Sequence, residues 1–243
     1  MKMSDKKKMA TTDILDEANI ERIISKNSFR PDVSPAVIKR LPRYFRYLRE
    51  VIRMGKTRVS SAELSRMMNV TASQIRQDLN CFGGFGQQGY GYNVNYLYTK
   101  ICEILGVGCG FRAAVIGAGN LGTALVRSPM FEKRGVDVVA MFDVSKDIVG
   151  KKIGNVEVFH INELEKVLRK YSVDIAILTL PKECTAEVAE RLEKTDVMGI
   201  WNFTGKELTV GEDQVLENVH VGDSLMTLCY EVAQKMYAND GKN

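Results

Sequence analysis

A glycine-rich run is the first group of residues in this sequence whose types and spacing could bind a ligand. Gly117, Gly119 and Gly122 form a G-x-G-x-x-G pattern between an apolar stretch and a helical one. In that context the first glycine permits a tight turn, the second lets the backbone approach a pyrophosphate, and the third lets the helix pack closely on the strand. The helix N-terminus adds free N–H groups and a partial positive charge. The run predicts a dinucleotide site.

An acidic residue stands where such a site uses one. Asp143 follows the next apolar stretch, 21 residues after Gly122. A carboxylate at this place can accept hydrogen bonds from the adenosine ribose hydroxyls. Its negative charge would repel a 2′-phosphate, so we expect NAD(H) rather than NADP(H).

A second group of residues is typical of DNA recognition. Ser60 with Glu63, and Thr71 with Gln74, form two capping boxes, each opening a short helix, with a tight turn at Asn69 between them. Two short helices joined in this way indicate a helix-turn-helix, in which the second helix reads DNA. The outward polar residues of that second helix are Ser73, Gln74, Arg76, Gln77 and Asn80.

The flanking segments complete a winged-helix pattern. Upstream, Ser34-Pro35 predicts the start of a helix whose apolar spacing runs to Ile52, with a kink or break at Pro42. Downstream, residues 81–94 contain five glycines and no acidic residue. That composition favours a β-hairpin wing with residues 87–89 at its tip, whereas a flexible linker is the alternative.

The positive charge of the chain is concentrated in this same part. Residues 30–106 hold 12 Lys and Arg against 5 Asp and Glu, whereas residues 107–243 hold 16 against 20. A solvated helix face could carry such charge, but its concentration in one domain-sized segment favours a polyanion partner.

The pattern changes at residues 106–110, where we expect a domain junction. Apolar strands then alternate with helices, which predicts an α/β fold with a parallel, doubly wound, Rossmann-type sheet whose last strand lies at 219–221. A final helix at 223–237 has a broad apolar face, for packing on its own domain or on a second subunit. The expected segments are an N-terminal extension (1–29), a winged-helix DNA-binding domain (30–106), a Rossmann NAD(H)-binding domain (107–222) and a C-terminal dimerisation helix and tail (223–243).

The sequence gives little support for a metal site, a membrane span or a signal peptide. Five cysteines lack any C-x-x-C spacing and only two histidines occur, so we expect no metal site and a reducing, cytoplasmic compartment. No apolar run reaches the roughly 18 residues of a membrane span, and the N-terminus lacks the apolar core of a signal peptide.

Catalysis is not indicated either. Hydride-transfer enzymes usually pair the nicotinamide with a positioned acid or base, and the candidates here are His160, His220 and scattered lysines such as Lys182. His160 is more simply a surface histidine. Sensing of the dinucleotide is favoured over turnover.

From Ser34 to Tyr237 the sequence resembles the Rex family, bacterial redox-sensing transcriptional repressors that bind DNA as homodimers and are released by NADH. The resemblance rests on the order and spacing of seven stretches: residues 38–44 with 46, 74–79 with 82–83, 89–94, 117–122, 142–144, 178–181 and 202–203. It implies a redox-sensing repressor, not an enzyme, that binds double-stranded operator DNA and NAD(H).

The resemblance also implies which residues do this. The implied dinucleotide-binding residues are Gly117, Ala118, Gly119, Asn120, Leu121, Gly122, Asp143, Val144, Thr179, Pro181 and Asn202. The implied DNA-binding residues, on phosphates, in the major groove or at the wing, are Arg58, Ser60, Ser61, Thr71, Ser73, Gln74, Arg76, Gln77, Gln88 and Tyr90. The final helix is implied to swap between subunits.

The sequence departs from the family pattern at several places. Gln77, Gln87 and Gln88 stand where Lys or Arg is common, so we expect a lower salt dependence. Ser128 stands where Tyr is common and His220 where Asp is common, in a family in which Tyr, Asp and an Arg equivalent to Arg46 can exchange hydrogen-bonded partners. We therefore expect a weak preference for NADH over NAD+, or none.

Two other functions stay open from the sequence. One is an NAD-dependent oxidoreductase with an N-terminal interaction module, which the lack of a catalytic pair disfavours. The other is an architectural DNA-binding protein with a vestigial nucleotide domain, which a failure to bind any dinucleotide would favour.

Overall fold

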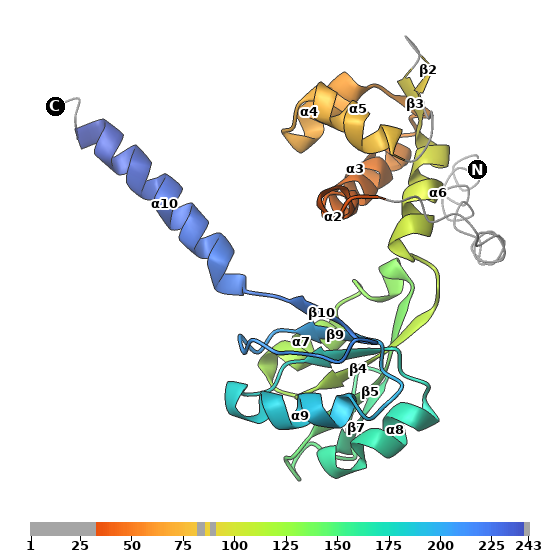
Figure 1. Cartoon of the computed structure of the whole chain (residues 1–243), viewed down its shortest axis with the longest axis vertical. Coiled ribbons are helices and arrows are strands. Elements are labelled where there is room, and N and C mark those ends of the chain that lie inside the picture. Colours follow the sequence, from red (N-terminus) through yellow and green to blue (C-terminus); the bar gives the residue numbers. More distant parts are fainter. Residues whose placement is uncertain (1–32, 82–85, 88–90, 241–243) are drawn as a thin grey trace, which may run out of the picture. The chain divides into compact units, whose positions relative to one another are not determined.

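The computed structural model describes residues 33–81, 86–87 and 91–240, and the chain divides into two compact units at Cys109 and Gly110 (Figure 1). This division lies in the glycine-rich stretch where the sequence predicts a junction. Each unit has its own hydrophobic core. The predicted extension, residues 1–29, lies outside the described residues.

The first unit combines short helices with a small antiparallel sheet of order β1-β3-β2. Fully buried side chains from four of its helices, among them Leu48, Leu64, Ile75 and Ile101, form one core. Its described elements are α2 (Pro35–Ile38), α3 (Leu41–Arg53), β1 (Arg58–Val59), α4 (Ser61–Met68), α5 (Ala72–Asn80), β2 (Gly86–Gln87), β3 (Gly91–Asn93) and α6 (Val94–Leu105).

Proline divides the first predicted helix in two. The sequence predicts a kink or break at Pro42, and the structure has a break, with α2 ending at Ile38 and α3 beginning at Leu41. Pro42 occupies the second position of α3, where its missing N–H removes no helical hydrogen bond. Pro35 likewise begins α2, although the Ser34 side chain makes no capping bond there.

The second unit is built on a seven-stranded sheet of order β10-β9-β8-β4-β5-β7-β6, parallel except for the β6–β7 pair. This confirms the predicted α/β class with a parallel sheet. Its elements are β4 (Phe111–Ile116), α7 (Asn120–Arg127), η2 (Glu132–Arg134), β5 (Val136–Asp143), β6 (Lys152–Ile153), β7 (Val156–His160), η3 (Ile161–Glu163), α8 (Leu164–Lys170), β8 (Ile175–Leu178), η4 (Lys182–Cys184), α9 (Thr185–Leu192), β9 (Gly199–Asn202), β10 (Val215–Asn218) and α10 (Val221–Asp240).

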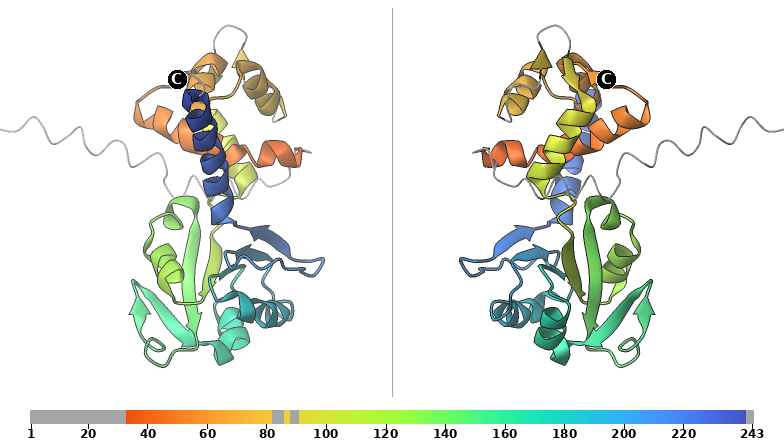
Figure 2. Two further views of the ribbon diagram at one scale, coloured as in Figure 1. Left: turned by 90° about the vertical axis from the view of Figure 1, so that its left-hand side faces the viewer. Right: turned by 90° about the vertical axis from the view of Figure 1, so that its right-hand side faces the viewer.

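Both faces of this sheet are buried. Along β4, Ala114 and Ile116 belong to one core cluster and Ala113 and Val115 to the other, as the two-residue period of a strand requires. Figure 2 shows α7 (green) on one side of the sheet and α8 and α9 (teal to blue) on the other. Strands of nearly continuous apolar residues predict such a sheet, which is covered on both faces.

The predicted last strand is wrong in position. The apolar pattern predicts this strand at 219–221, whereas β10 is Val215–Asn218 and Val221 already begins α10. β10 is an edge strand that pairs only with β9 in the sheet order. Its residues alternate between exposed and partly buried, so it lacks the continuous apolar run that marks the inner strands.

Candidate nucleic-acid interface and dinucleotide site

The glycine-rich loop joins β4 to α7 at the carboxyl edge of the parallel sheet. Gly117 has a φ of +105°, and a Cβ built on it would lie 2.7 Å from the Thr179 carbonyl oxygen. A Cβ on Gly122 would lie 2.0 Å from the Gly117 carbonyl oxygen. The backbone conformation and the packing of α7 on the loop therefore both require glycine, as the sequence pattern predicts.

Gly119 differs from its two neighbours in the motif. Its φ is −70°, and a Cβ built there would have no heavy atom within 4 Å. Among the residues that the structure describes, no packing contact demands glycine at this position. An approaching ligand would supply such a demand, because a side chain here would occupy the space in front of the N-terminus of α7.

Asp143 ends β5, the neighbour of β4, and its carboxylate is bonded to the loop. Its Oδ2 accepts a hydrogen bond from the Ala118 N–H at 2.8 Å, and its Oδ1 accepts from the N–H groups of Val144 (2.8 Å) and Ser145 (2.9 Å). A carboxylate has about four acceptor positions. Capacity is left for a hydroxyl of a ligand.

On the other side of β4, Thr179 follows β8. Its Oγ1 donates a hydrogen bond to the carbonyl oxygen of Gly117 at 2.8 Å, so this hydroxyl shapes the glycine loop from the side opposite Asp143. Pro181 lies at the start of η4, two residues further along. The strand order places residues 117–122, Asp143, Val144 and Thr179 together, where β5 and β8 flank β4 and the order of connection reverses.

Asn202 ends β9 and is 1% exposed. Its Nδ2 donates to the Lys206 carbonyl at 2.7 Å and to Asn218 Oδ1 at 2.8 Å, and its Oδ1 accepts from both the N–H and the hydroxyl of Thr204. Two donors and two acceptor positions are the full capacity of a primary amide. Asn202 therefore holds the ends of β9 and β10 and the loop at 203–206 in place, and a ligand bond to its side chain would have to displace one of these.

Ser128 and His220, which stand where Tyr and Asp are common in the family, each contact a nearby residue. Ser128 ends α7, and its Oγ accepts from the Met130 N–H at 3.3 Å. His220 precedes α10, and its Nε2 lies 3.3 Å from Oε1 of Glu207, a partner that the sequence analysis missed because 13 residues separate the two. Arg46, in the other unit, lies with its guanidinium carbon 5.4 Å from the centroid of the Tyr47 ring.

The helix-turn-helix forms as predicted. The capping box at Ser60 is complete, since the Ser60 hydroxyl accepts from the Glu63 N–H at 3.1 Å and the Glu63 carboxylate accepts from the Ser60 N–H at 2.9 Å. These bonds, first the backbone one, then those from Lys56 and the Ser60 hydroxyl, lower the pKa of Glu63 to about 2. Asn69 turns the chain in the left-handed conformation, with a φ of 52°.

The second predicted capping box is only half formed. The Thr71 hydroxyl accepts from the Gln74 N–H at 3.1 Å, as predicted. The Gln74 side chain, however, does not return to Thr71, because its Nε2 donates to Asp78 Oδ1 at 2.8 Å. The bond to an ionised carboxylate is stronger than the neutral bond that the Gln74 side chain would make with the Thr71 N–H.

Asp78 anchors α5 to the start of α3. The Arg40 guanidinium donates to both of its oxygens, at 2.6 and 2.8 Å, and the buried Tyr44 hydroxyl donates at 2.9 Å. Burial of Asp78 opposes its ionisation, but the hydrogen bonds from Arg40, Gln74 and Tyr44 outweigh it and hold its pKa below the usual range. Burial and the bond to Asp78 raise the pKa of Tyr44.

The face of α5 that points away from Ile75 and Leu79 is open, and Gln74 lies at its margin, one turn from Asp78. Ser73, Arg76 and Gln77 are exposed and Gln74 is partly exposed, whereas Ile75 and Leu79 are buried. Arg76 Nη1 donates to Ser61 Oγ at 3.2 Å, which brings together predicted DNA-binding residues of α4 and α5. Arg58 lies on β1. Of the predicted wing, β2 and β3 pair antiparallel, but Gln88 and Tyr90 lie outside the described residues.

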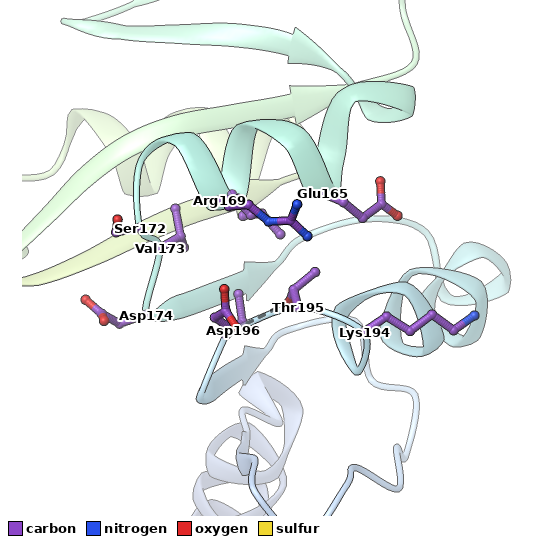
Figure 3. A pocket seen from close by; sticks show the side chains of 10 residues that line it. Glu165, Arg169, Ser172, Val173, Asp174, Lys194, Thr195 and Asp196 are labelled. Carbon is purple, nitrogen blue, oxygen red and sulfur yellow. Dashed lines mark hydrogen bonds between the residues drawn. The ribbon is translucent and has the colours of Figure 1, made fainter.

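A separate hollow of about 260 Å³ lies at the amino edge of the sheet (Figure 3). Asp174 and Val197, which precede β8 and β9, line it with Arg169 and Lys194 from the ends of α8 and α9. Since the glycine-rich loop follows the carboxyl end of β4, this hollow is not the dinucleotide site.

The described residues contain neither a cluster of metal ligands nor a membrane-spanning helix. No group of three or more His, Cys, Asp or Glu among them could hold a metal ion. Within residues 33–81, 86–87 and 91–240, no helix has the length and apolar character needed to cross a membrane.

Comparison with known proteins identifies both units. Residues 32–80 match a family model described as a putative DNA-binding protein N-terminus, and residues 111–205 match one described as a CoA binding domain. The redox-sensing transcriptional repressor Rex of Caldicellulosiruptor saccharolyticus is 47% identical over 207 residues, 85% of this chain and 94% of that protein. The Clostridium botulinum protein of the same name is 49% identical over 199 residues, 82% of this chain and 95% of that protein.

Solved structures give the same result. A crystal structure of RSP in complex with β-NAD+ and operator DNA superposes with a TM-score of 0.80 at 46% identity, covering 88% of this chain and 98% of that one. RSP in complex with β-NADH superposes with a TM-score of 0.79 at 43% identity, covering 87% and 99%. A further crystal structure of RSP names it a Rex-family repressor. With these relatives alike over more than four fifths of its length, this chain belongs to the Rex family of redox-sensing transcriptional repressors.

Proposed function

We propose that this repressor binds a palindromic operator as a homodimer and that NADH, bound at the carboxyl edge of the second unit, releases it from DNA. The observation that carries the proposal is the presence in one chain of a formed helix-turn-helix and of a glycine loop with an open position at Gly119. RSP, a relative of the same architecture, binds β-NAD+ with operator DNA and binds β-NADH.

On the DNA side, α5 is the recognition helix. Arg76, Gln77 and Gln74 would face base edges in the major groove, while Ser60, Ser61, Thr71 and Ser73 lie at the N-termini of α4 and α5, which favour phosphates. The anchoring of α5 through Asp78 fixes the angle at which this face is presented. Arg58 on β1 would add a phosphate contact beside the wing.

On the dinucleotide side, the residues present fit an NAD(H) molecule. Gly119 leaves room for a pyrophosphate at the N-terminus of α7, and Asp143 has an acceptor position for a ribose hydroxyl. Leu121 and Val144 are exposed at this edge and would cover the apolar face of the ligand. The nicotinamide would carry the redox state that is sensed, and the residues of this chain would bind and orient it.

The C-terminal helix supplies the dimer contact in this proposal. α10 has 20 residues, and its large apolar side chains remain exposed in the single chain. Four of them, Leu225, Leu228, Val232 and Met236, follow helical spacing on one stripe. Burial of a stripe of this size calls for a second subunit. In such a dimer, a ligand changes DNA binding only if it binds two conformations of the dimer with different affinities.

The chain is a repressor and not an oxidoreductase. Its relatives of 47% and 49% identity are redox-sensing transcriptional repressors. Of the two histidines, His160 Nδ1 accepts from the Asn162 N–H at 3.2 Å and His220 contacts Glu207. All five cysteines are unpaired, which fits the reducing cytoplasm that we propose as its compartment.

Sedimentation of the protein with a labelled duplex tests the DNA-binding part of the proposal. We expect two chains on a palindromic duplex and a loss of affinity when the spacing between half-sites changes by half a helical turn. A single chain that binds one half-site as tightly as the palindrome would contradict it.

A further inference from the structure

The hydrogen bonds of Asp78 reach a residue on the DNA-facing side of α5. Asp78 is 1% exposed, and its two oxygens share four donors. Oδ2 accepts from Arg40 Nε and the Tyr44 hydroxyl, whereas Oδ1 accepts from Arg40 Nη2 and from Nε2 of Gln74. Three donors hold the carboxylate in the core, and the fourth belongs to a partly exposed side chain.

This last bond fixes which end of the Gln74 amide faces inward. An ionised carboxylate only accepts hydrogen bonds, so it can face the NH2 group of Gln74 and not the carbonyl oxygen. A glutamine without such a partner presents either end, because both orientations fit the same space. Beside Asp78 one orientation is left, with Oε1 turned away from the carboxylate.

We propose that Asp78 is a positioning residue for operator recognition: it locks the amide of Gln74 so that this residue offers a fixed acceptor to the DNA and selects a base that carries an exocyclic amino group. In the major groove such groups are N6 of adenine and N4 of cytosine, whereas guanine and thymine offer O6 and O4, which are acceptors. The proposal rests on the proposed function, in which α5 enters the major groove.

The arrangement suits this role because the lock is built into the core. Arg40, which precedes α3, and Tyr44 on α3 hold Asp78, and the four-residue separation of Gln74 and Asp78 puts them on adjacent turns of α5. Ordering the side chain before it meets DNA reduces the entropy that binding must overcome. The fixed orientation also disfavours a base that presents an acceptor in the major groove, since that acceptor would face the Oε1 of Gln74, which is itself an acceptor.

The test compares operator duplexes in which exocyclic amino groups are deleted one at a time, adenine to purine and cytosine to 2-pyrimidinone. With the wild-type protein we expect one position in each half-site at which the deletion weakens binding by about tenfold. In Gln74→Ala that deletion should have no effect. If no amino deletion depends on residue 74, the proposal is overturned, and this part needs no variant of Asp78.

Asp78→Asn then tests the lock. A neutral amide at residue 78 can face either end of Gln74, so the discrimination at that one position should fall from about tenfold to near onefold while the other positions keep theirs. The change should also vanish in a Gln74→Ala background. Unaltered discrimination in Asp78→Asn, or an equal loss at every position, would overturn the proposal.

Tyr44→Phe is the matched control. It removes a bond to Oδ2 and leaves the bond between Oδ1 and Gln74, so it should lower the midpoint of thermal unfolding yet keep the base preference. A Tyr44→Phe protein that loses the same base preference would show a merely structural effect of Asp78. A wild-type protein that does not distinguish operator from random DNA would instead refute the proposed function, and the two failures are thus separate.

Discussion

The carboxylate of Asp143 accepts a hydrogen bond from the backbone N–H of Ala118 over 2.8 Å. This bond joins the end of β5 to the loop that follows β4, and Thr179 holds the same loop from the side of β8. Asp143 therefore shapes the glycine loop in addition to the ligand contact that its position predicts. The two roles can be separated by substitution.

Asp143→Asn should remove the charge and keep one acceptor oxygen, for Ala118 or for Val144 and Ser145, whereas Asp143→Ala should remove the charge and every bond to the loop. We expect the Asn variant to bind NADP(H) better relative to NAD(H), by on the order of tenfold, because the repulsion of a 2′-phosphate is gone. The Ala variant should in addition bind both ligands more weakly, since the loop loses an anchor. Calorimetric dissociation constants measure this; an NAD-to-NADP ratio unchanged in both variants would exclude Asp143 from the site.

Gly119→Val should leave folding and DNA binding intact and abolish the response to NADH. The new side chain meets no protein atom within 4 Å of its Cβ, but it takes the space of the pyrophosphate, at a cost on the order of 1–3 kcal/mol of binding free energy or more. Gly122→Val is the contrasting variant. Its Cβ would lie 2.0 Å from the Gly117 carbonyl oxygen, so we expect a lower melting temperature there. NADH release retained by Gly119→Val would place the ligand elsewhere.

Arg76→Ala should relax operator specificity. Arg76 is exposed on α5 and donates to Ser61, and a guanidinium bidentate to guanine contributes about 1–3 kcal/mol of discrimination. Competition between operator and random duplex at one salt concentration measures the ratio. Equal ratios for wild type and variant would remove Arg76 from the base contacts.

Acid should weaken the capping box at Ser60 as the pH falls from 4.5 toward 2. The Ser60 N–H, then Lys56 and the Ser60 hydroxyl, lower the pKa of Glu63 from 4.5 to about 2. A lowered pKa stabilises the folded state above its ordinary value, and this contribution is lost as the pH falls from 4.5 toward 2. Glu63→Gln keeps an acceptor for Ser60 but does not titrate. We expect the free energy of unfolding, from urea titrations, to fall less steeply in Glu63→Gln over that range; parallel curves would refute the interpretation.

Much of the architecture could be predicted because its signals are local. The break at Pro42, the capping box at Ser60 and the strand-loop-helix at residues 117–122 each depend on residues only a few positions apart. Predictions from neighbouring residues fail where a group held by a residue distant in sequence competes for the same side chain. The Gln74 side chain leaves its expected cap for Asp78, whose charge is held by Arg40, 38 residues away in sequence.

The site residues show the same limit. Asn202 follows an apolar strand, which makes it a reasonable ligand candidate, but its bonds to Asn218 and to the loop at 203–206 depend on the pairing of β9 with β10. The position of this edge strand could not be predicted from apolar runs because its residues alternate between exposed and partly buried. Glu207, the partner of His220, carries no sequence signal of its own.

Preference for NADH over NAD+ should be weak in this chain, because Ser128 and His220 replace the Tyr and Asp common in the family. In the structure His220 lies 3.3 Å from Glu207, so a carboxylate is present near α10 but on a different residue. We expect Ser128→Tyr with His220→Asp to raise the ratio of the two dissociation constants, measured by calorimetry. A wild-type ratio that is already large, and unaltered by the double change, would show that sensing uses other residues.

The central claim is that a dinucleotide in the second unit controls DNA binding by the first. Fluorescence anisotropy of a labelled operator, with NADH and separately NAD+ titrated into the protein–operator complex at one salt concentration, tests it most directly. We predict that NADH lowers the anisotropy to that of free duplex in wild type and leaves it unchanged in Gly119→Val. Anisotropy that stays constant in wild type while calorimetry shows NADH bound would contradict the claim.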